Sequence, residues 1–347
     1  MRRGRAGIVV VGLLAVVAAG WTSAWAYAAY EAGQQLDLWL KAEAAQGRAW
    51  TCPDRAIGGY PFALDISCSN PTFTAQAMGQ GVEAQIAHLT AKVALWHPRK
   101  IALTLGAPFS YRTSDDTTNV GATWNALTLD LDGLPDIATV ALKGEKIAVS
   151  GTFGDQGRQS GTATRLDARF VLPDSPSPSA ADADPTLTFD IAADGLPIAP
   201  LDALVGGTDP ADVALSGRLD RADVGDARTP EEAIEHWREA HGQIVLDSSR
   251  ISRAGAKVTA TGILSLDDAH RPKGKLDAQF VGLGPILKRY GISGDMAAAG
   301  SLLSTLFGGG KPAAPTEPGA LALPISLRNG HLGVGPIDTG IAVPPLY

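Results

Sequence analysis

The two cysteines, Cys52 and Cys68, are the residues of this sequence best suited to covalent chemistry. The loop between them contains the turn-like sequence Gly58-Gly59-Tyr60-Pro61, and an alternating stretch places Cys68 on an apolar face. Two strands joined by such a loop could bring the sulfurs into bonding range, and the disulfide would stabilise the fold by about 3 kcal/mol. Two buried free thiols are the alternative. We expect the disulfide, because the features below place this segment outside the cytoplasm.

The sequence contains no recognisable catalytic motif. A Gly-x-Ser-x-Gly elbow is absent, and Gly308-Gly309-Gly310-Lys311 lacks the spacing of a phosphate-binding loop. The pairs Asp115-Asp116 and Asp267-Asp268 could act as acid and base, but they stand in turn-like stretches, where solvated carboxylates are usual. We therefore predict a protein that is not an enzyme and that has no catalytic residue, no cofactor and no metal. The histidines are scattered without paired metal-ligand spacing: His88, His97, His236, His241, His270 and His331.

An uncharged apolar segment near the N-terminus has the length of a transmembrane helix. Residues 8–30 carry no charged side chain, and about 20 apolar residues cross a bilayer as one helix. Residues 1–7 form a basic tip, which predicts a cytoplasmic position for that end. The remainder of the chain would then lie across the membrane. The tip contains Arg2, Arg3 and Arg5.

The same segment also fits a cleaved signal peptide. Ala24-Trp25-Ala26 resembles a small-x-small cleavage site, so processing after Ala26 is the alternative to a retained anchor. Retention is favoured by residues 31–46, whose apolar spacing continues the helix as far as Gly47. Under either interpretation, residues 47–347 form an extracytoplasmic domain. Retention is also favoured by a belt of aromatic residues at the outer end of the segment: Trp21, Trp25, Tyr27 and Tyr30.

The composition favours a β-rich ectodomain. The chain of 347 residues has 40 glycines and 23 prolines but only 6% aromatic residues, which suits many short strands and turns. The net charge is −7, and removing the three arginines of the tip leaves −10. An acidic ectodomain argues against nucleic acid as a partner.

Apolar and polar residues alternate repeatedly and predict a mainly β fold. We expect one large antiparallel, curved sheet or a two-layer β ectodomain, with a few short helices. A linker rich in proline and serine at 173–185 suggests two lobes, 47–172 and 186–347. The apolar parity changes near Ile86 and Ala87, which predicts a β-bulge.

Three segments carry helical signals in the C-terminal half. Thr229 and Pro230 have the residue types of an N-cap and a first helical position, and acidic residues follow them. Weaker helical patterns cover residues 285–290 and 296–307.

The stretch 257–283 predicts a hairpin with one apolar face. Apolar residues alternate in both of its strands and could oppose one another across the hairpin. Such a face must be covered by a second sheet, by helices or by a ligand. We take five large side chains as candidates to line a hydrophobic groove: Trp50, Phe62, Leu264, Leu276 and Phe280.

Three segments resemble one bacterial family. Ile57-Gly58-Gly59-Tyr60-Pro61-Phe62 leads into an alternating strand, and the segments 93–99 and 327–336 fit the same pattern. They are similar to an uncharacterised family of membrane-anchored envelope proteins, the domain-of-unknown-function 2125 family. This resemblance covers most of residues 30–347 and implies a location at the bacterial inner membrane, single-pass, with the bulk of the chain in the periplasm. The Gly-x-Leu-x-Leu-Asp pattern is more distantly similar to AsmA-like envelope proteins, which are associated with lipid handling.

Two functions from different classes follow from these features. The first is a binding module whose apolar sheet face holds a lipid or another hydrophobic molecule. The second is a structural or assembly factor of the cell envelope that acts through contacts with other envelope proteins. The sequence leaves both open.

Overall fold

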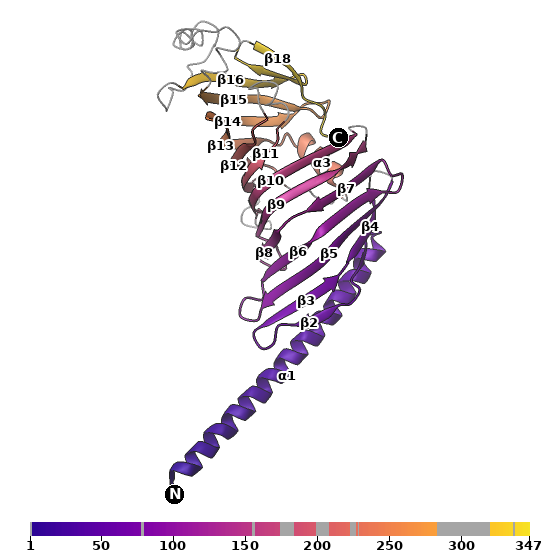
Figure 1. Cartoon of the computed structure of the whole chain (residues 1–347), viewed down its shortest axis with the longest axis vertical. Helices are drawn as coiled ribbons and strands as arrows, with labels where there is room; N and C mark the ends of the chain where they lie inside the picture. Colours follow the sequence, from indigo (N-terminus) through magenta and orange to yellow (C-terminus); the bar gives the residue numbers. More distant parts are fainter. Residues whose placement is uncertain are drawn as a thin grey trace. The chain divides into compact units, whose positions relative to one another are not determined.

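Figure 1 shows the computed structural model of the chain. The structure describes residues 2–77, 80–154, 157–173, 184–198, 208–222, 227, 229–282, 320–335 and 337–347. The weak helical patterns at 285–290 and 296–307 and most of the linker at 173–185 lie outside the described residues.

The N-terminal helix α1 (Arg2–Ala45) runs without a break through the predicted anchor and the predicted helix that follows it. From Val10 onward it is long and apolar enough to cross a membrane. It ends where Gly47 adopts a positive φ of 80° and the Arg48 N–H donates to the Glu43 carbonyl, so the chain turns into the first strand.

The described part of the chain is otherwise mainly β, and its strands form one antiparallel 18-stranded sheet. A single large sheet, the first of the two predicted architectures, is therefore what the structure contains. Its strands are β1 (Ala49–Thr51), β2 (Ala56–Gly58), β3 (Ala63–Ser69), β4 (Thr72–Ala77), β5 (Gln80–Ala94), β6 (Lys100–Thr113), β7 (Thr118–Thr123), β8 (Ala126–Asp132), β9 (Thr139–Phe153), β10 (Arg158–Val171), β11 (Leu187–Leu196), β12 (Ala211–Leu219), β13 (Ile244–Arg253), β14 (Ala256–Leu266), β15 (Pro272–Val281), β16 (Leu321–Arg328), β17 (His331–Val334) and β18 (Ile337–Ala342).

The chain divides into two compact units. Unit 1 comprises residues 1–135 and 148–160, and unit 2 comprises residues 136–147 and 161–347. Strands β9 and β10 contribute residues to both units.

The long strands β5 and β6 organise unit 1. Strand β5 pairs with β4 along one half of its length and with β3 along the other, and the pairing register with β6 shifts between Ile86 and His88. This shift is the β-bulge that the change of apolar parity near Ile86 predicted. Helix α1 runs beside β1 and β2 in this unit, and its N-terminal part extends beyond the strands (Figure 1).

Unit 2 is an antiparallel meander from β10 to β18 in which each strand pairs with the next along the chain. Helix α3 (Pro230–Glu239) interrupts it between β12 and β13. The helix begins as predicted, because the Thr229 hydroxyl accepts a hydrogen bond of 3.2 Å from the Glu232 N–H. Its Trp237 is buried and donates a 2.9 Å hydrogen bond to the Asp220 carbonyl, which fixes the helix to the end of β12.

Candidate functional site

The predicted hairpin is formed by β14 and β15. Val258 lies opposite Phe280, Ala260 opposite Ala278, and Leu264 opposite Gly274. Since side chains alternate between the two faces of a strand, this register puts the predicted apolar residues of both strands on one face.

This apolar face extends well beyond the hairpin. Cross-strand pairing links apolar and small residues into rows that run across unit 2. The rows form because the apolar positions of each strand lie opposite the apolar positions of the next. We call the residues of four such rows the apolar face. The rows are Leu187-Leu219-Ile244-Leu264-Gly274-Leu327-Leu332, Phe189-Gly217-Leu246-Gly262-Leu276-Ile325-Val334, Ile191-Leu215-Ser249-Ala260-Ala278-Leu323, and Ala193-Val213-Ile251-Val258-Phe280.

The opposite face of the same strands is mainly polar, with Val245 and Ile263 as apolar exceptions. Arg218 on β12 pairs with Asp247 on β13 at 2.8 Å. Another row on this face runs Ala192-Ala214-Arg250-Thr259-Gln279. Unit 2 therefore has one face suited to water and one that is not.

The large side chains of the apolar face are accessible. Every leucine, isoleucine, valine and phenylalanine in the four rows is half-buried, and no large apolar side chain in the described part of the chain is less than 2% exposed. The residues of the rows that are buried are small ones, such as Ala193, Ala260 and Ala278. A core sealed between two sheets would bury large side chains fully, so these residues line a partly open surface.

The five candidate groove residues fall into two groups. Leu264, Leu276 and Phe280 lie together on the apolar face of unit 2. Trp50 and Phe62 belong to unit 1, where they are 40% and 59% exposed.

The two aromatic candidates of unit 1 have different surroundings. The ring of Trp50 lies 4.4 Å from that of Phe73 and 6.0 Å from that of Trp39 on α1, measured between centroids. Phe62 stands at the end of the β2–β3 turn, 5.9 Å from the ring of Trp96. Trp96 and Tyr60 were not among the predicted site residues. Their signal in the sequence is a nearby proline, Pro98 and Pro61, because an aromatic side chain in a turn has little to pack against.

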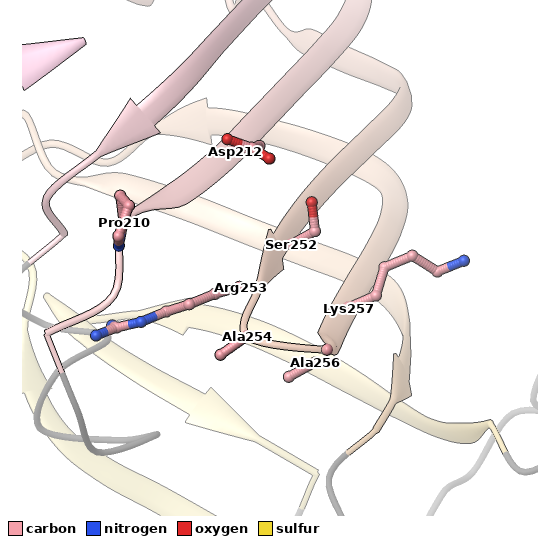
Figure 2. Close-up of a pocket in the computed structure, with 8 residues that line it drawn as sticks. Pro210, Asp212, Ser252, Arg253, Ala254, Ala256 and Lys257 are labelled. Carbon is pink, nitrogen blue, oxygen red and sulfur yellow. The ribbon is translucent and has the colours of Figure 1, made fainter. Parts of the chain in front are cut away.

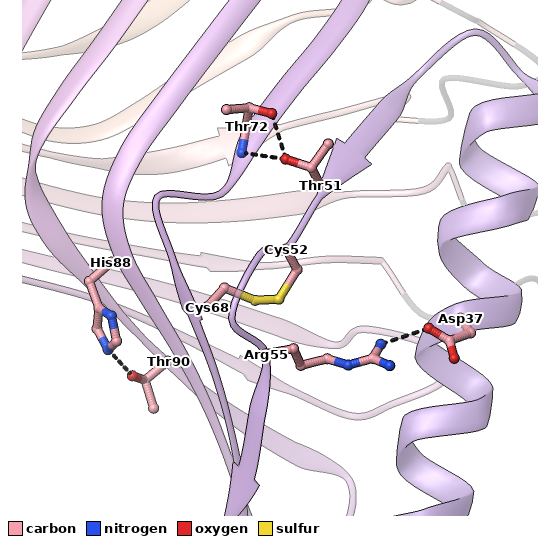
Figure 3. Close-up of a disulfide and its surroundings, with 8 residues drawn as sticks. All are labelled: Asp37, Thr51, Cys52, Arg55, Cys68, Thr72, His88 and Thr90. Atoms are coloured by element: carbon pink, nitrogen blue, oxygen red, sulfur yellow. Dashed lines mark hydrogen bonds and ion pairs between the residues drawn. A yellow bond between two sulfur atoms is a disulfide. The ribbon is translucent and has the colours of Figure 1, made fainter.

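Cys52 and Cys68 form the predicted disulfide, with their Cα atoms 5.2 Å apart (Figure 3). Cys68 is buried in β3. Nearby, Arg55 forms an ion pair of 2.7 Å with Asp37 of α1, and this contact lowers the pKa of the Asp37 carboxyl. The disulfide joins the segment after β1 to β3, and the ion pair joins the same segment to α1.

A hollow of about 310 Å³ lies at the β13–β14 turn (Figure 2). Its lining includes Arg253 together with Asp212 and Lys257, which the strand register puts on the polar face. Arg253 is only 5% exposed. The hollow is thus a polar site at the end of these strands.

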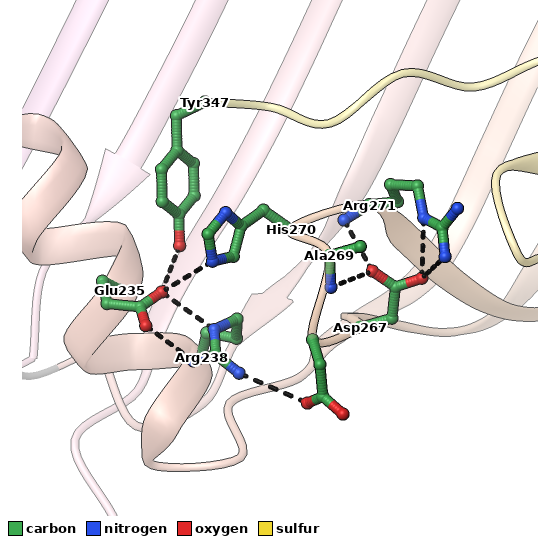
Figure 4. A network of polar contacts seen from close by, with 8 residues as sticks. Glu235, Arg238, Asp267, Ala269, His270, Arg271 and Tyr347 are labelled. Atoms are coloured by element: carbon green, nitrogen blue, oxygen red, sulfur yellow. Dashed lines mark hydrogen bonds and ion pairs between the residues drawn. The ribbon is translucent and has the colours of Figure 1, made fainter.

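A polar cluster holds the C-terminal segment to α3 and to the β14–β15 turn (Figure 4). Glu235 accepts two hydrogen bonds of 2.6 and 2.8 Å from Arg238 and a further one from the Tyr347 hydroxyl. The Arg238 guanidinium, and after it the Tyr347 hydroxyl, lower the pKa of Glu235 to about 2. The His270 ring stacks on the Tyr347 ring, with the two centroids 4.4 Å apart. The backbone carbonyl of His270 accepts a hydrogen bond from the Leu346 N–H. A carboxylate held ionised by a guanidinium is suited to fastening a chain segment.

The Asp267-Asp268 pair is part of a turn, as its sequence suggested. Asp267 accepts hydrogen bonds from the Ala269 and Arg271 N–H groups and pairs with the Arg271 side chain. The hydrogen bond from the Arg271 N–H, and after it the Arg271 guanidinium, lower the pKa of the Asp267 carboxyl. Among the described residues, no group of three or more histidine, cysteine, aspartate or glutamate side chains could hold a metal ion.

Comparison with known proteins gives one relationship. Among curated proteins and among solved structures there is no match. The model of one protein family matches residues 25–342, which is most of the chain and includes both units. That family is the one suggested by the segments around residues 57–62, 93–99 and 327–336, whereas the more distant similarity to AsmA-like proteins finds no support in these comparisons. The chain belongs to the family described as "Uncharacterized protein conserved in bacteria (DUF2125)".

Proposed function

We propose that this protein is an envelope protein of the bacterial inner membrane that holds a lipid or another hydrophobic molecule on the apolar face of unit 2. Helix α1 would anchor it, and both units would lie in the periplasm. Three features support this placement: the helix from Val10 onward could cross a membrane, the family occurs in bacteria, and Cys52 and Cys68 are bonded. Disulfides persist in the periplasm and are rare in the cytosol.

The observation that carries the proposal is the half-buried state of the large side chains on the apolar face. Covering such surface stabilises a complex by about 25 cal/mol per Å² of apolar area removed from water. Burial of this face by a hydrophobic ligand would therefore be favourable in free energy.

The dimensions of the face suit an acyl chain. The row from Phe189 to Val334 crosses seven strands, and six spacings of about 4.8 Å give roughly 29 Å. An acyl chain extended through one leaflet covers about half of the ~30 Å hydrocarbon core of a bilayer.

The test compares the lipid content of two variants of the full chain. Leu276→Asn places an amide on the apolar face, and Ile263→Asn places the same amide on the opposite face, where Ile263 is 47% exposed. Both variants and the natural chain are exchanged into a lipid-free detergent, and their organic extracts are measured by mass spectrometry. We expect lipid in near-equimolar amount with the natural chain and with Ile263→Asn, and several-fold less with Leu276→Asn.

Absence of lipid from the natural chain would contradict the proposal. If a defined envelope protein co-purified instead and was lost with Leu276→Asn, the face would be a surface for protein assembly.

A further inference from the structure

Three large aromatic side chains are exposed at neighbouring turns of unit 1. Tyr60 and Phe62 lie in the β2–β3 turn and are 53% and 59% exposed, and Trp96 follows β5 and is 62% exposed. The two turns are joined by a hydrogen bond from the Leu95 N–H to the Phe62 carbonyl and by the contact between the Phe62 and Trp96 rings. We call these three residues the aromatic loop surface. Clustered exposed apolar groups mark a site of interaction.

The aromatic loop surface is fixed to one short stretch of α1. The Trp21 indole donates a 2.8 Å hydrogen bond to the Pro61 carbonyl, and the Trp25 indole donates one of the same length to the Ala63 carbonyl. The Thr22 and Tyr60 hydroxyls are 2.9 Å apart. The depth of this stretch in a membrane therefore sets the depth of the loops.

The sequence of α1 fixes that depth. At roughly 1.5 Å per residue, the helix rises about 30 Å between Arg5 and Trp25. The hydrocarbon core of a bilayer is also about 30 Å thick. With Arg5 among the cytoplasmic headgroups, Trp21 and Trp25 reach the opposite interface, where tryptophan and tyrosine side chains are favoured.

We propose that Tyr60, Phe62 and Trp96 dock into the interfacial region of the bilayer leaflet on the extracytoplasmic side. This rests on the proposed function in one respect, that α1 remains in the membrane. We infer that the partner is the bilayer, because the aromatic loop surface is hydrogen-bonded to the segment of α1 that leaves the bilayer. Burial of the aromatic rings in the interface provides the attraction.

The docking has a consequence for lipid access. The first apolar residues beyond these turns are Leu64 opposite Val93 and Ile101 opposite Leu131, and they begin the apolar side of the unit 1 strands. With the turns in the interface, this apolar surface starts at the leaflet. An acyl chain could then move from the bilayer onto the protein without crossing water.

The test measures the depth of nitroxide labels on the full chain in nanodiscs of phosphatidylethanolamine and phosphatidylglycerol. Single cysteines are introduced as Phe62→Cys, Trp96→Cys, Ser114→Cys and Leu14→Cys, while Cys52 and Cys68 stay oxidised. Ser114 is the matched control, because it is exposed and lines a hollow with Gly47, about 33 Å beyond Trp25 along the helix. Leu14 reports whether α1 spans the bilayer. Power saturation compares collisions with oxygen, which partitions into lipid, and with a water-soluble nickel chelate.

We expect the ratio of oxygen to nickel collisions at Phe62 and Trp96 to exceed that at Ser114 several-fold. If Leu14 is lipid-exposed while Phe62 and Trp96 match Ser114, the docking is overturned and the anchor stands. If Leu14 is also in water, the anchor and the docking both fail. Circular dichroism of each labelled chain confirms that it retains its strands, and a second label pair, Tyr60→Cys and Asp116→Cys, repeats the comparison at independent positions.

Discussion

Leu276 on β15 lies directly opposite Gly262 on β14, and its side chain leans over the glycine. A Cβ atom added to Gly262 would lie 3.0 Å from the Leu276 Cδ2 atom and 2.4 Å from the Lys275 carbonyl oxygen. The φ angle of Gly262 is 155°, a conformation that other residues rarely adopt. The middle of the apolar face thus depends on a glycine for its close strand approach.

Gly262→Ala should therefore destabilise unit 2 by about 2 kcal/mol, through the steric clash and the backbone strain. The measurement is the free energy of opening for β14 and β15, from amide hydrogen exchange. Gly161→Ala is the matched control, because no atom lies within 4 Å of its added Cβ and its φ is not positive. Equal effects of the two substitutions would contradict the role of Gly262.

Loss of the disulfide should weaken unit 1. Replacing Cys52 and Cys68 with serine removes a bridge between residues 16 apart in the sequence, which is expected to cost about 3 kcal/mol of stability. Urea unfolding followed by tryptophan fluorescence measures this change. A reductant should shift the midpoint of the natural chain to that of the variant and leave the variant unchanged. Two free thiols in the natural protein, detected by alkylation, would contradict the bridge.

The C-terminal segment should detach in acid. The pKa of Glu235 is lowered from 4.5 to about 2 by Arg238 and Tyr347, so the ionised carboxylate stabilises the folded state above pH 4.5. This stabilisation decreases as the pH falls from 4.5 and is lost once it passes about 2. Exchange of the Leu346 N–H, which donates to the His270 carbonyl, reports the detachment.

Glu235→Gln should raise the exchange rate of Leu346 at neutral pH and reduce its acid dependence. Glu239→Gln, an exposed glutamate at the end of the same helix, is the control and should behave as the natural chain. Identical acid profiles for the natural chain and Glu235→Gln would show that other groups hold the segment.

Several elements predicted from local patterning are present in the described part of the chain. Alternation predicted the β14–β15 hairpin and its apolar face, a change of parity predicted the bulge at Ile86, and an N-cap at Thr229 predicted the start of α3. The disulfide was predicted from the turn-like loop between the cysteines and from the expected position of this segment outside the cytoplasm. Each of these features depends on residues close together in the sequence, or on the face of a single strand.

Features that depend on distant side chains were not predictable. Glu235 and Tyr347 are 112 residues apart, and nothing in their surroundings in the sequence indicates that they meet. The hydrogen bond from Trp21 to Pro61 crosses 40 residues for the same reason. Alternation also could not distinguish one open sheet from two packed sheets, because both require an apolar residue at every second position.

Removing the exposed rings should slow lipid transfer without unfolding the chain. The double variant Phe62→Ser, Trp96→Ser lacks two of the three side chains of the aromatic loop surface, and both are largely exposed, so stability should change by only about 0.5 kcal/mol. We expect several-fold slower loading of the protein with a fluorescent phospholipid from nanodiscs. The pair Thr117→Ser, Asn119→Ser, at exposed positions in and after the β6–β7 turn, should load at the natural rate. Unchanged loading by the first variant would show that the rings do not assist transfer.

Photo-crosslinking from adjacent positions of β14 determines whether the apolar face of unit 2 holds a lipid. A benzophenone side chain at Leu264 would stand on the apolar face, and one at Ile263 on the opposite face. After irradiation of living cells, we predict phospholipid attached to the chain at Leu264 and little or none at Ile263. Equal labelling at the two positions, or no lipid at Leu264, would show that the apolar face is not a lipid-binding surface.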